Sequence, residues 1–192
     1  MAIIEVSNPI AGGAGVVVQS QSVGSPAASA AAAVHAAVAD NGAPQTVTTG
    51  ITQPDVPRNI TATAGGTAAD VKAIQVTLNG IDIDDQAISE VLPAFTVNTA
   101  GIVTGSKAFK TIASIEIPAH DGTGATTAIG TGAKLGIAAR LGRNTVLAAY
   151  LNGVKEGTEP TVGFDGTNIS GNTATLNSTL NGSAVVLDFY NS

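Results

Sequence analysis

The segment Thr48–Gly66, TTGITQPDVPRNITATAGG, restricts the fold more than any other part of the sequence. Two Thr- and Ile-rich runs lie on either side of Pro54 and Pro57. Proline fixes φ, lacks an N–H donor and pushes the residue before it toward an extended conformation. The segment therefore predicts a stiff corner between two strands. It offers no nucleophile, metal-ligand cluster or phosphate-binding loop.

From Gln45 onward, the sequence is typical of a β protein. Runs rich in Thr, Val and Ile recur at the spacing of about 8–12 residues that sandwiches and barrels show, and Gly, Pro, Asn and Asp separate them. These runs predict a mainly β fold, an antiparallel β-sandwich or barrel-like domain over residues 45–192. The predicted strands are Gln45–Ile51, Asn59–Ala64, Lys72–Ile83, Ala87–Leu92, Phe95–Val97, Phe109–Ile117, Thr126–Ile129, Thr145–Leu151, Thr161–Phe164, Thr173–Leu176 and Ala184–Tyr190.

Asn-Gly pairs predict turns within this pattern, because both residues tolerate the positive φ of two-residue hairpins. Asn152-Gly153 and Asn181-Gly182 are each expected to close a hairpin. Asn79-Gly80 is ambiguous, because the alternating apolar pattern continues beyond it toward Asp84-Asp85-Gln86. We expect the later turn, with Gly80 marking a bulge and the strand Ala87–Leu92 returning along the longer run. Leu135–Arg143 has the one other plausible helical turn, kept short by its glycines.

Residues 1–44 are expected to form an extended N-terminal arm. The first 24 residues suit a flexible, Gly/Ala-rich segment that ends in a strand near Val16–Val18 and clamps onto a neighbouring subunit. Ser25-Pro26 before an Ala run favours a helix start, whereas Val34–Val38 favours a strand that turns at residues 41–44 and pairs with residues 45–51. We favour the strand, with an irregular or helical Ala run before it.

The core must be built from small side chains. Aromatic residues make up 3% of the sequence, whereas 44% of residues are hydrophobic, and there is no Cys. The absence of Cys excludes disulfides, thiolate metal ligands and Cys nucleophiles. Because Ala, Val, Ile and Leu each contribute less buried area than a large aromatic, stability must come from many close contacts, and burial between subunits would add to it. The composition therefore predicts an oligomer, or a subunit that docks on a larger surface.

The charge pattern argues against nucleic acid and membrane partners. The formal net charge is −6, and the eight Lys and Arg residues are scattered rather than clustered. Phosphate binding needs several cations on one face. The N-terminus lacks the basic region of a secretory signal, and no apolar run approaches the length of a membrane span. We expect a soluble protein that is synthesised in a cytoplasm.

His120-Asp121-Gly122 is the cluster most similar to a catalytic or metal site. Catalysis or metal binding needs convergent partners, and the second His of the chain is His35. A turn after the strand that ends at Pro118 is the favoured interpretation.

Two further groups resemble ligand sites weakly. Asp82, Asp84, Asp85 and Glu90 would gather carboxylates at a hairpin tip, but they lack the spacing of a calcium loop, so a solvated acidic tip is expected. Gly122–Gly124 and Gly130–Lys134 resemble phosphate loops, but Ala133 precedes Lys134 and Leu135 follows it, so turns are expected. We therefore assign no catalytic, cofactor-binding or metal-binding residue, expect no cofactor, and do not expect an enzyme.

Three stretches resemble a family of small virion proteins of tailed bacteriophages that are often encoded near the major capsid protein. They are Thr48–Thr63 (TTGITQPDVPRNITAT), Gly105–Gly122 (GSKAFKTIASIEIPAHDG) and Gly130–Leu135 (GTGAKL). The resemblance covers roughly residues 45–140. Gln53, where members often have Asn, and Ile137, where members often have Pro, depart from the family pattern.

The resemblance implies a head cement or decoration protein on the capsid surface of the virion, synthesised in the host cytoplasm. Its expected partners are the major capsid protein and further copies of itself, as a homotrimer. A phage tail subunit of the tube or tip is the alternative structural role. An adhesin-like binding β-sandwich is the alternative from another class, but such sites usually display exposed aromatics, and this chain has only six.

Overall fold

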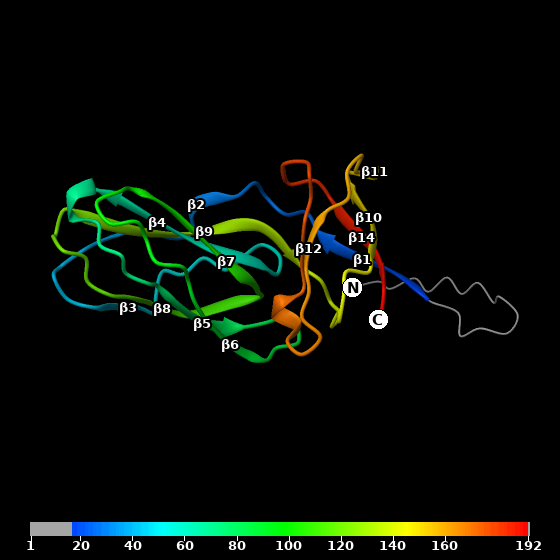
Figure 1. The fold of residues 1–192 in the computed structure, drawn as a ribbon, viewed down its shortest axis with the longest axis horizontal. Coiled ribbons are helices and arrows are strands. Elements are labelled where there is room, and N and C mark those ends of the chain that lie inside the picture. Colours follow the sequence, from blue (N-terminus) through cyan, green and yellow to red (C-terminus); the bar gives the residue numbers. More distant parts are fainter. Residues whose placement is uncertain (1–16, 192) are drawn as a thin grey trace, which may run out of the picture.

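Antiparallel β-sheets make up almost all of the regular structure in the computed structural model, which describes residues 17–191 (Figure 1). The mainly β prediction is therefore confirmed. Two single-turn 3-10 helices, Ala68–Asp70 and Ile169–Gly171, interrupt the strands. The strands are β1 (Val18–Gly24), β2 (Ala30–Ala39), β3 (Gln45–Val47), β4 (Arg58–Gly66), β5 (Thr77–Ile81), β6 (Ala87–Val91), β7 (Gly101–Phe109), β8 (Thr111–Ile117), β9 (Ala125–Gly136), β10 (Val146–Leu151), β11 (Val154–Lys155), β12 (Thr161–Gly163), β13 (Thr173–Thr175) and β14 (Val185–Tyr190).

These strands form three sheets. The long sheet has the order β12-β13-β9-β4-β7, and β2 also pairs with β9. The facing sheet has the order β3-β8-β5-β6, and the end sheet has the order β1-β14-β10-β11. Figure 1 shows the end sheet at one end of an elongated molecule, with the described part of the N-terminal region and the C-terminus beside it.

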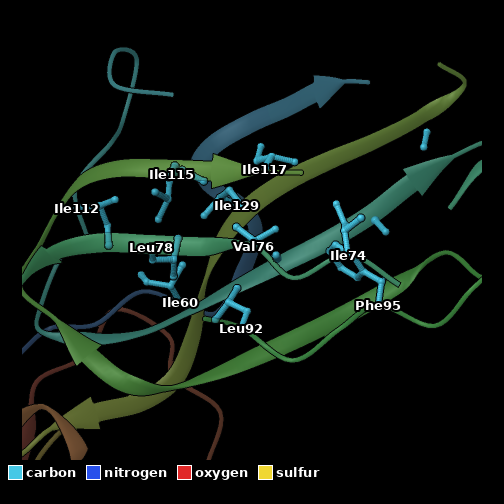
Figure 2. Packing of buried hydrophobic residues seen from close by; sticks show 14 of the residues in the cluster. Ile60, Ile74, Val76, Leu78, Leu92, Phe95, Ile112, Ile115, Ile117 and Ile129 are labelled. Carbon is cyan, nitrogen blue, oxygen red and sulfur yellow. The ribbon is translucent and has the colours of Figure 1, made fainter. Parts of the chain in front are cut away.

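The main core lies between the long sheet and the facing sheet. Ile60 of β4 and Ile129 of β9 point at Leu78 of β5 and Ile115 of β8, and all four side chains are fully buried (Figure 2). Alternation along each strand sends every second side chain to this interface. Burial of each aliphatic side chain of this size contributes roughly 1.5–3 kcal/mol to stability. Many such side chains together therefore provide the stabilisation that large aromatic residues would otherwise give.

A second core lies under the end sheet. Leu187 and Phe189 of β14 pack with Leu135 at the end of β9 and with Ile137 and Leu141 in the loop that follows. The chain thus runs from the sandwich into the end sheet through β9, whose two halves belong to different cores. Because β9 is continuous, it ties the two cores together.

The proline corner joins the facing sheet to the long sheet, since residues 48–57 connect β3 to β4. Val56 is buried, and the Gln53 side chain exchanges two hydrogen bonds with the backbone of Ile112, donating to its oxygen at 3.0 Å and accepting from its nitrogen at 2.6 Å. The corner is therefore held by packing and by specific hydrogen bonds. The predicted corner between two strands is present.

The hairpin β5–β6 turns at residues 82–86 and not at Asn79-Gly80, as expected from the alternation. Opposite β8 the register shifts between Asn79 and Gly80, so the predicted irregularity is present, with the extra residue on β8. A Cβ at Gly80 would lie 2.0 Å from the Thr111 oxygen. The glycine thus permits the close approach of β8.

The predicted strand Lys72–Ile83 is too long, because β5 covers only Thr77–Ile81, and the predicted strand Phe95–Val97 is wrong. Residues 72–76 and 92–97 run beside each other, with hydrogen bonds from the Leu92 nitrogen to the Val76 oxygen and from the Phe95 nitrogen to the Ile74 oxygen. Pro93, which lies between Leu92 and Phe95, has no N–H to donate. The two hydrogen bonds are three residues apart on one segment and two residues apart on the other, so they do not form a regular ladder.

Two long strands contain glycines that hid them. The predicted strand Thr126–Ile129 extends to Gly136 as β9, through Gly130 and Gly132. β7, which contains Gly101 and Gly105, was not predicted at all, and the predicted strand Phe109–Ile117 corresponds to β8. Glycine is depleted in strands, so a propensity argument misses both. The helical turn expected in Leu135–Arg143 is also absent from the structure.

The Ala run forms a strand. β2 covers Ala30–Ala39 and includes the favoured Val34–Val38, so the helical alternative is wrong. The expected pairing with residues 45–51 is also wrong, because β2 pairs with β9 while β3 pairs with β8. The turn between β2 and β3 therefore crosses from one sheet to the other. Gly42, at φ 79°, lies in this crossover, and its nitrogen donates to Asp40.

Residues 18–39, which the sequence assigned to the arm, contribute β1 to the end sheet and β2 to the long sheet. The apolar run Ile3–Val6 and the Gly/Ala-rich segment before Val17 lie outside the described residues. Asn152-Gly153 closes the β10–β11 hairpin, with φ of 52° and 75°. Asn181-Gly182 lies at a bend but closes no hairpin, because β14, the strand after it, pairs with β1 and β10 and not with β13, the strand before it.

Candidate functional site

His120 is a buried structural residue. Its side chain lies 6% exposed, its Nδ1 accepts a hydrogen bond from the Lys72 nitrogen at 3.1 Å, and its Nε2 lies 3.0 Å from Thr127 Oγ1. Because Nδ1 accepts, the proton sits on Nε2 and is donated to Thr127. The His120 nitrogen also donates to the Asp40 carboxylate. The residue thus fastens the turn after β8 to two other segments, in agreement with the predicted turn.

Burial makes His120 a pH-sensitive contact. Desolvation lowers the pKa of its imidazole below the usual value, although the carboxylates of Asp40 and Asp121 oppose this by favouring the charged form. The unfolded chain therefore binds this proton at a higher pH than the folded protein does, and stability is lost as pH falls below about 6.5. We expect denaturant unfolding at stepped pH to show this loss in the wild type. The pH dependence of the free energy of unfolding should become smaller in His120→Gln and should be retained in the control His35→Gln. An unchanged pH dependence in His120→Gln would contradict the assignment of this loss to His120.

The four acidic residues do not form one solvated tip. Asp82 is buried and accepts hydrogen bonds from the Asp84 and Gln86 nitrogens, which shapes the turn. Asp84 pairs with Arg140 at 2.9 Å and Asp85 with Lys110 at 2.6 Å.

Glu90 lies apart from that turn, opposite Leu78 near the other end of the β5–β6 hairpin. It is buried and accepts hydrogen bonds from the Ser106 nitrogen at 2.7 Å and the Ser106 hydroxyl at 2.8 Å. The interpretation of all four carboxylates as one exposed cluster is therefore wrong, because two of them satisfy buried backbone or hydroxyl donors.

Residues 17–191 contain no group of three or more side chains suited to holding a metal ion. In the same range, no helix has the length and hydrophobicity needed to cross a bilayer.

The Gly-rich segment Gly130–Lys134 forms an irregular part of β9 and not a turn. The β4–β9 register moves from Ile60 opposite Thr131 to Arg58 opposite Leu135, so β9 carries extra residues there. A Cβ at Gly132 would lie 2.3 Å from the Asn59 side chain. Glycine is required because Asn59 fills this space. Gly122–Gly124, in contrast, lies in the predicted turn.

Side chains of β4 form hydrogen bonds with backbone groups of β9 at this bulge. Arg58 Nε donates to the Gly132 oxygen at 2.8 Å, and the Lys134 nitrogen donates to Asn59 Oδ1 at 2.9 Å. Asn59 Nδ2 in turn donates to the Gly105 oxygen on β7 at 3.0 Å. Arg58 and Asn59 are both fully buried, so three strands are joined at one point.

Arg58 also reaches the proline corner. Its Nη1 donates to Asp55 Oδ1 and to the Ala27 oxygen, both at 3.0 Å. Burial raises the pKa of the Asp55 carboxyl, but hydrogen bonds from Ala27 and Arg58 together with the Arg58 charge outweigh it, and the net pKa lies below the usual value. The β1–β2 connection is thereby fixed to β4.

A groove opens above this bulge on the long sheet. Its central cavity measures about 400 Å³. A hollow of about 250 Å³ adjoins it and shares Ser29 and Ala133, and a hollow of about 350 Å³ shares Lys134 and Thr175. Both hollows therefore adjoin the central cavity. The central cavity is lined in part by Thr61, Ile102, Thr104, Thr131, Lys134 and Thr175.

The central cavity combines hydroxyls, one ammonium and an exposed apolar side chain. Thr61 and Thr131, which line the cavity, are 8% and 6% exposed. Half-buried Lys134 donates from Nζ to the Gly105 oxygen at 3.2 Å. Ile102 is 61% exposed, and Phe164, which lines the neighbouring hollow, is 52% exposed. Such a surface suits binding and holds no group arranged for catalysis.

The sequence does not predict this groove. In the sequence, Lys134 belongs to a segment that departs from the phosphate-loop pattern, and Arg58 and Asn59 belong to a stretch that resembles the phage family. The available signal was Gly-Thr-Gly inside a Thr-rich run, since isolated glycines in a strand indicate a bulge or the close approach of another group.

No family model matches this chain, and neither a curated protein nor a solved structure matches it.

Proposed function

We propose that this chain is a structural protein of a tailed-bacteriophage virion that binds the assembled capsid lattice and stabilises it as a cement or decoration subunit. The observation that carries the proposal is a coincidence of sequence and geometry. The three stretches that resemble the phage family are separated in the sequence, yet they meet in one hydrogen-bonded cluster at the base of the groove.

The cluster takes residues from each stretch. Arg58 and Asn59 come from the first stretch, Gly105 begins the second, and Gly132 and Lys134 belong to the third. The first and second stretches also meet where Gln53 binds the backbone of Ile112. Because the three stretches contact one another, a chain that has one of them needs the other two. This supports a common fold for chains that share all three stretches.

Stabilisation of the lattice follows from mass action. A subunit that binds only the assembled lattice stabilises it by RT ln(1 + [L]/Kd), which is about 2.7 kcal/mol for each site when the free concentration is 100 times Kd. The proposed partners are the major capsid protein and two further copies of this chain in a trimer. Exposed Val91, Val97, Leu147 and Val154 on the described surface are available for such contacts.

The test uses virions that carry the chain and particles from which it has been deleted. We expect hundreds of copies on the head, trimeric density at lattice symmetry axes in a micrograph reconstruction, and a higher temperature of capsid disruption after the purified chain is added back. Recovery of the chain with isolated tails, at a copy number too low for the head lattice, would overturn the cement role in favour of a tail subunit.

A further inference from the structure

We infer that the groove above the β9 bulge receives an extended acidic segment of the partner, with an Asp or Glu carboxylate entering the central cavity and pairing with Lys134. Assigning that segment to the major capsid protein rests on the proposed function. The preference of the groove for a carboxylate rests on the geometry alone.

Charge is the first argument. Four cations of the chain, Arg58, Lys72, Lys110 and Arg140, form ion pairs with carboxylates. Lys134 is half-buried and has no ion pair among the described residues, and it is the one charged side chain among the residues that line the central cavity. Partial burial of an ammonium costs free energy unless an opposite charge compensates it. A ligand carboxylate provides this compensation.

Hydrogen-bonding capacity is the second argument. The Lys134 ammonium has three donors, of which one is used on the Gly105 oxygen. Thr61 and Thr131 line the same cavity, and each adds a hydroxyl that can donate a hydrogen bond. A carboxylate accepts up to about four hydrogen bonds and can use the ammonium and the hydroxyls together.

Shape favours an extended chain over a compact ligand. The central cavity shares two lining residues with each of the two neighbouring hollows. An extended segment advances about 3.3 Å per residue and directs alternate side chains to opposite sides, so one side chain can enter the cavity while its neighbours contact exposed Ile102 and Phe164.

The acid nearest to this path does not neutralise Lys134. Asp165 lines the hollow that shares Lys134, but its carboxylate accepts hydrogen bonds from the Thr167 nitrogen at 2.8 Å and the Asn168 nitrogen at 3.0 Å. The hydrogen bond from the Asn168 side chain at 3.0 Å contributes most, and together with these two backbone bonds it holds the pKa of Asp165 below the usual value. The carboxylate is thus directed to its loop, and the groove keeps its positive centre.

A peptide titration tests the groove by itself. The probes are acetyl-Ala-Glu-Ala-amide and acetyl-Ala-Gln-Ala-amide, added to the isotope-labelled full chain and followed by amide chemical shifts. We expect the Glu peptide to shift Thr61, Thr131 and Lys134, and to bind about tenfold more tightly than the Gln peptide, as one charge-assisted contact allows. Equal affinity for the two peptides, or shifts confined to other regions, would overturn the inference.

Lys134→Met should weaken binding of the Glu peptide about tenfold and remove the difference between the two peptides. The matched control is Lys107→Met, because Lys107 is also half-buried, donates to a backbone oxygen (Ser89, 2.8 Å) and does not line the central cavity. A well-dispersed amide spectrum of Lys134→Met verifies that any loss of binding is not caused by unfolding. Lys134→Gln, which keeps a polar side chain but lacks the charge, should lose the preference for the Glu peptide in the same way. Full binding by Lys134→Met would contradict the role of its ammonium.

Particle binding separates this inference from the proposed function. If the wild type binds deleted particles, Lys134→Met should bind them more weakly and Lys107→Met should bind them normally. Equal binding of all three would refute the assignment of the segment to the capsid while leaving the cement role intact. If the wild type fails to bind particles, the cement role fails, and the peptide titration alone decides the carboxylate preference.

Discussion

Replacement of Arg58 by methionine is expected to lower the free energy of unfolding by about 3 kcal/mol. Arg58 is fully buried and donates to the oxygens of Gly132 and Ala27 and to Asp55. Methionine fills much of the volume but supplies no donor. The carbonyls of Gly132 and Ala27 then lose this donor, and an unsatisfied buried acceptor costs about 1–3 kcal/mol. The Asp55 carboxylate loses the Arg58 charge but keeps its hydrogen bonds from the Ala27 and Val56 nitrogens.

The expected value lies at the lower end of what broken buried pairs cost, because the Asp55 side chain is 35% exposed and water can solvate it after the change. Arg58→Lys should recover little of the loss, since an ammonium cannot reproduce the planar fork of the guanidinium.

Urea unfolding measures the effect. The matched control is Arg140→Met, which removes an ion pair with Asp84 from a side chain that is 50% exposed and should change stability by less than about 1 kcal/mol. Arg58→Met with the same small effect as this control would show that the bulge is held by the backbone and not by the guanidinium.

The second large effect is expected for Gly130→Ala. A Cβ at this position would lie 2.1 Å from the Ala30 oxygen and 2.6 Å from the Ala31 carbonyl carbon. Both are backbone atoms of β2, so no side-chain rotation relieves the overlap. We expect a loss of about 2–3 kcal/mol, within the usual range for overpacking.

The damage should be local to β2. Hydrogen exchange is expected to accelerate in Ala30–Ala39, while the amides of β5 and β8 keep their protection until global unfolding. Gly101→Ala is the matched control in the same sheet, because a Cβ there meets no atom within 4 Å. Unchanged exchange in β2 of the Gly130→Ala protein would mean that the strand does not approach β9 as closely as described.

Alternating Thr, Val and Ile residues were sufficient to predict much of the sandwich. The β5–β6 hairpin, the proline corner and the strand Val146–Leu151 follow from local patterns, because each is specified by alternation and by the turn residues beside it. Strands built from Ala or interrupted by Gly were harder to predict. The sequence predicted only part of β2 and only the first part of β9. In these strands, small residues are required by the close approach of other backbone segments and not by strand propensity.

The groove lies beyond sequence reasoning for the same reason. It depends on Asn59 and Lys134, which are 75 residues apart and meet because β9 carries extra residues opposite β4. A bulge of this kind has no propensity signal apart from its glycines. The pairing of sheets is likewise non-local, so the residues predicted the turn between β2 and β3 but not that it changes sheets.

The position of β14 between β1 and β10 affects how the protein is made. Val18 pairs with Tyr190, so β1 leaves the ribosome more than 170 residues before its neighbour exists (190 − 18 = 172). Synthesis at about 5–20 residues per second leaves that edge without its native partner for roughly ten seconds or more. A strand that waits so long is a target for chaperones and for mispairing between nascent chains, and its late closure delays the moment at which a subunit becomes competent to assemble.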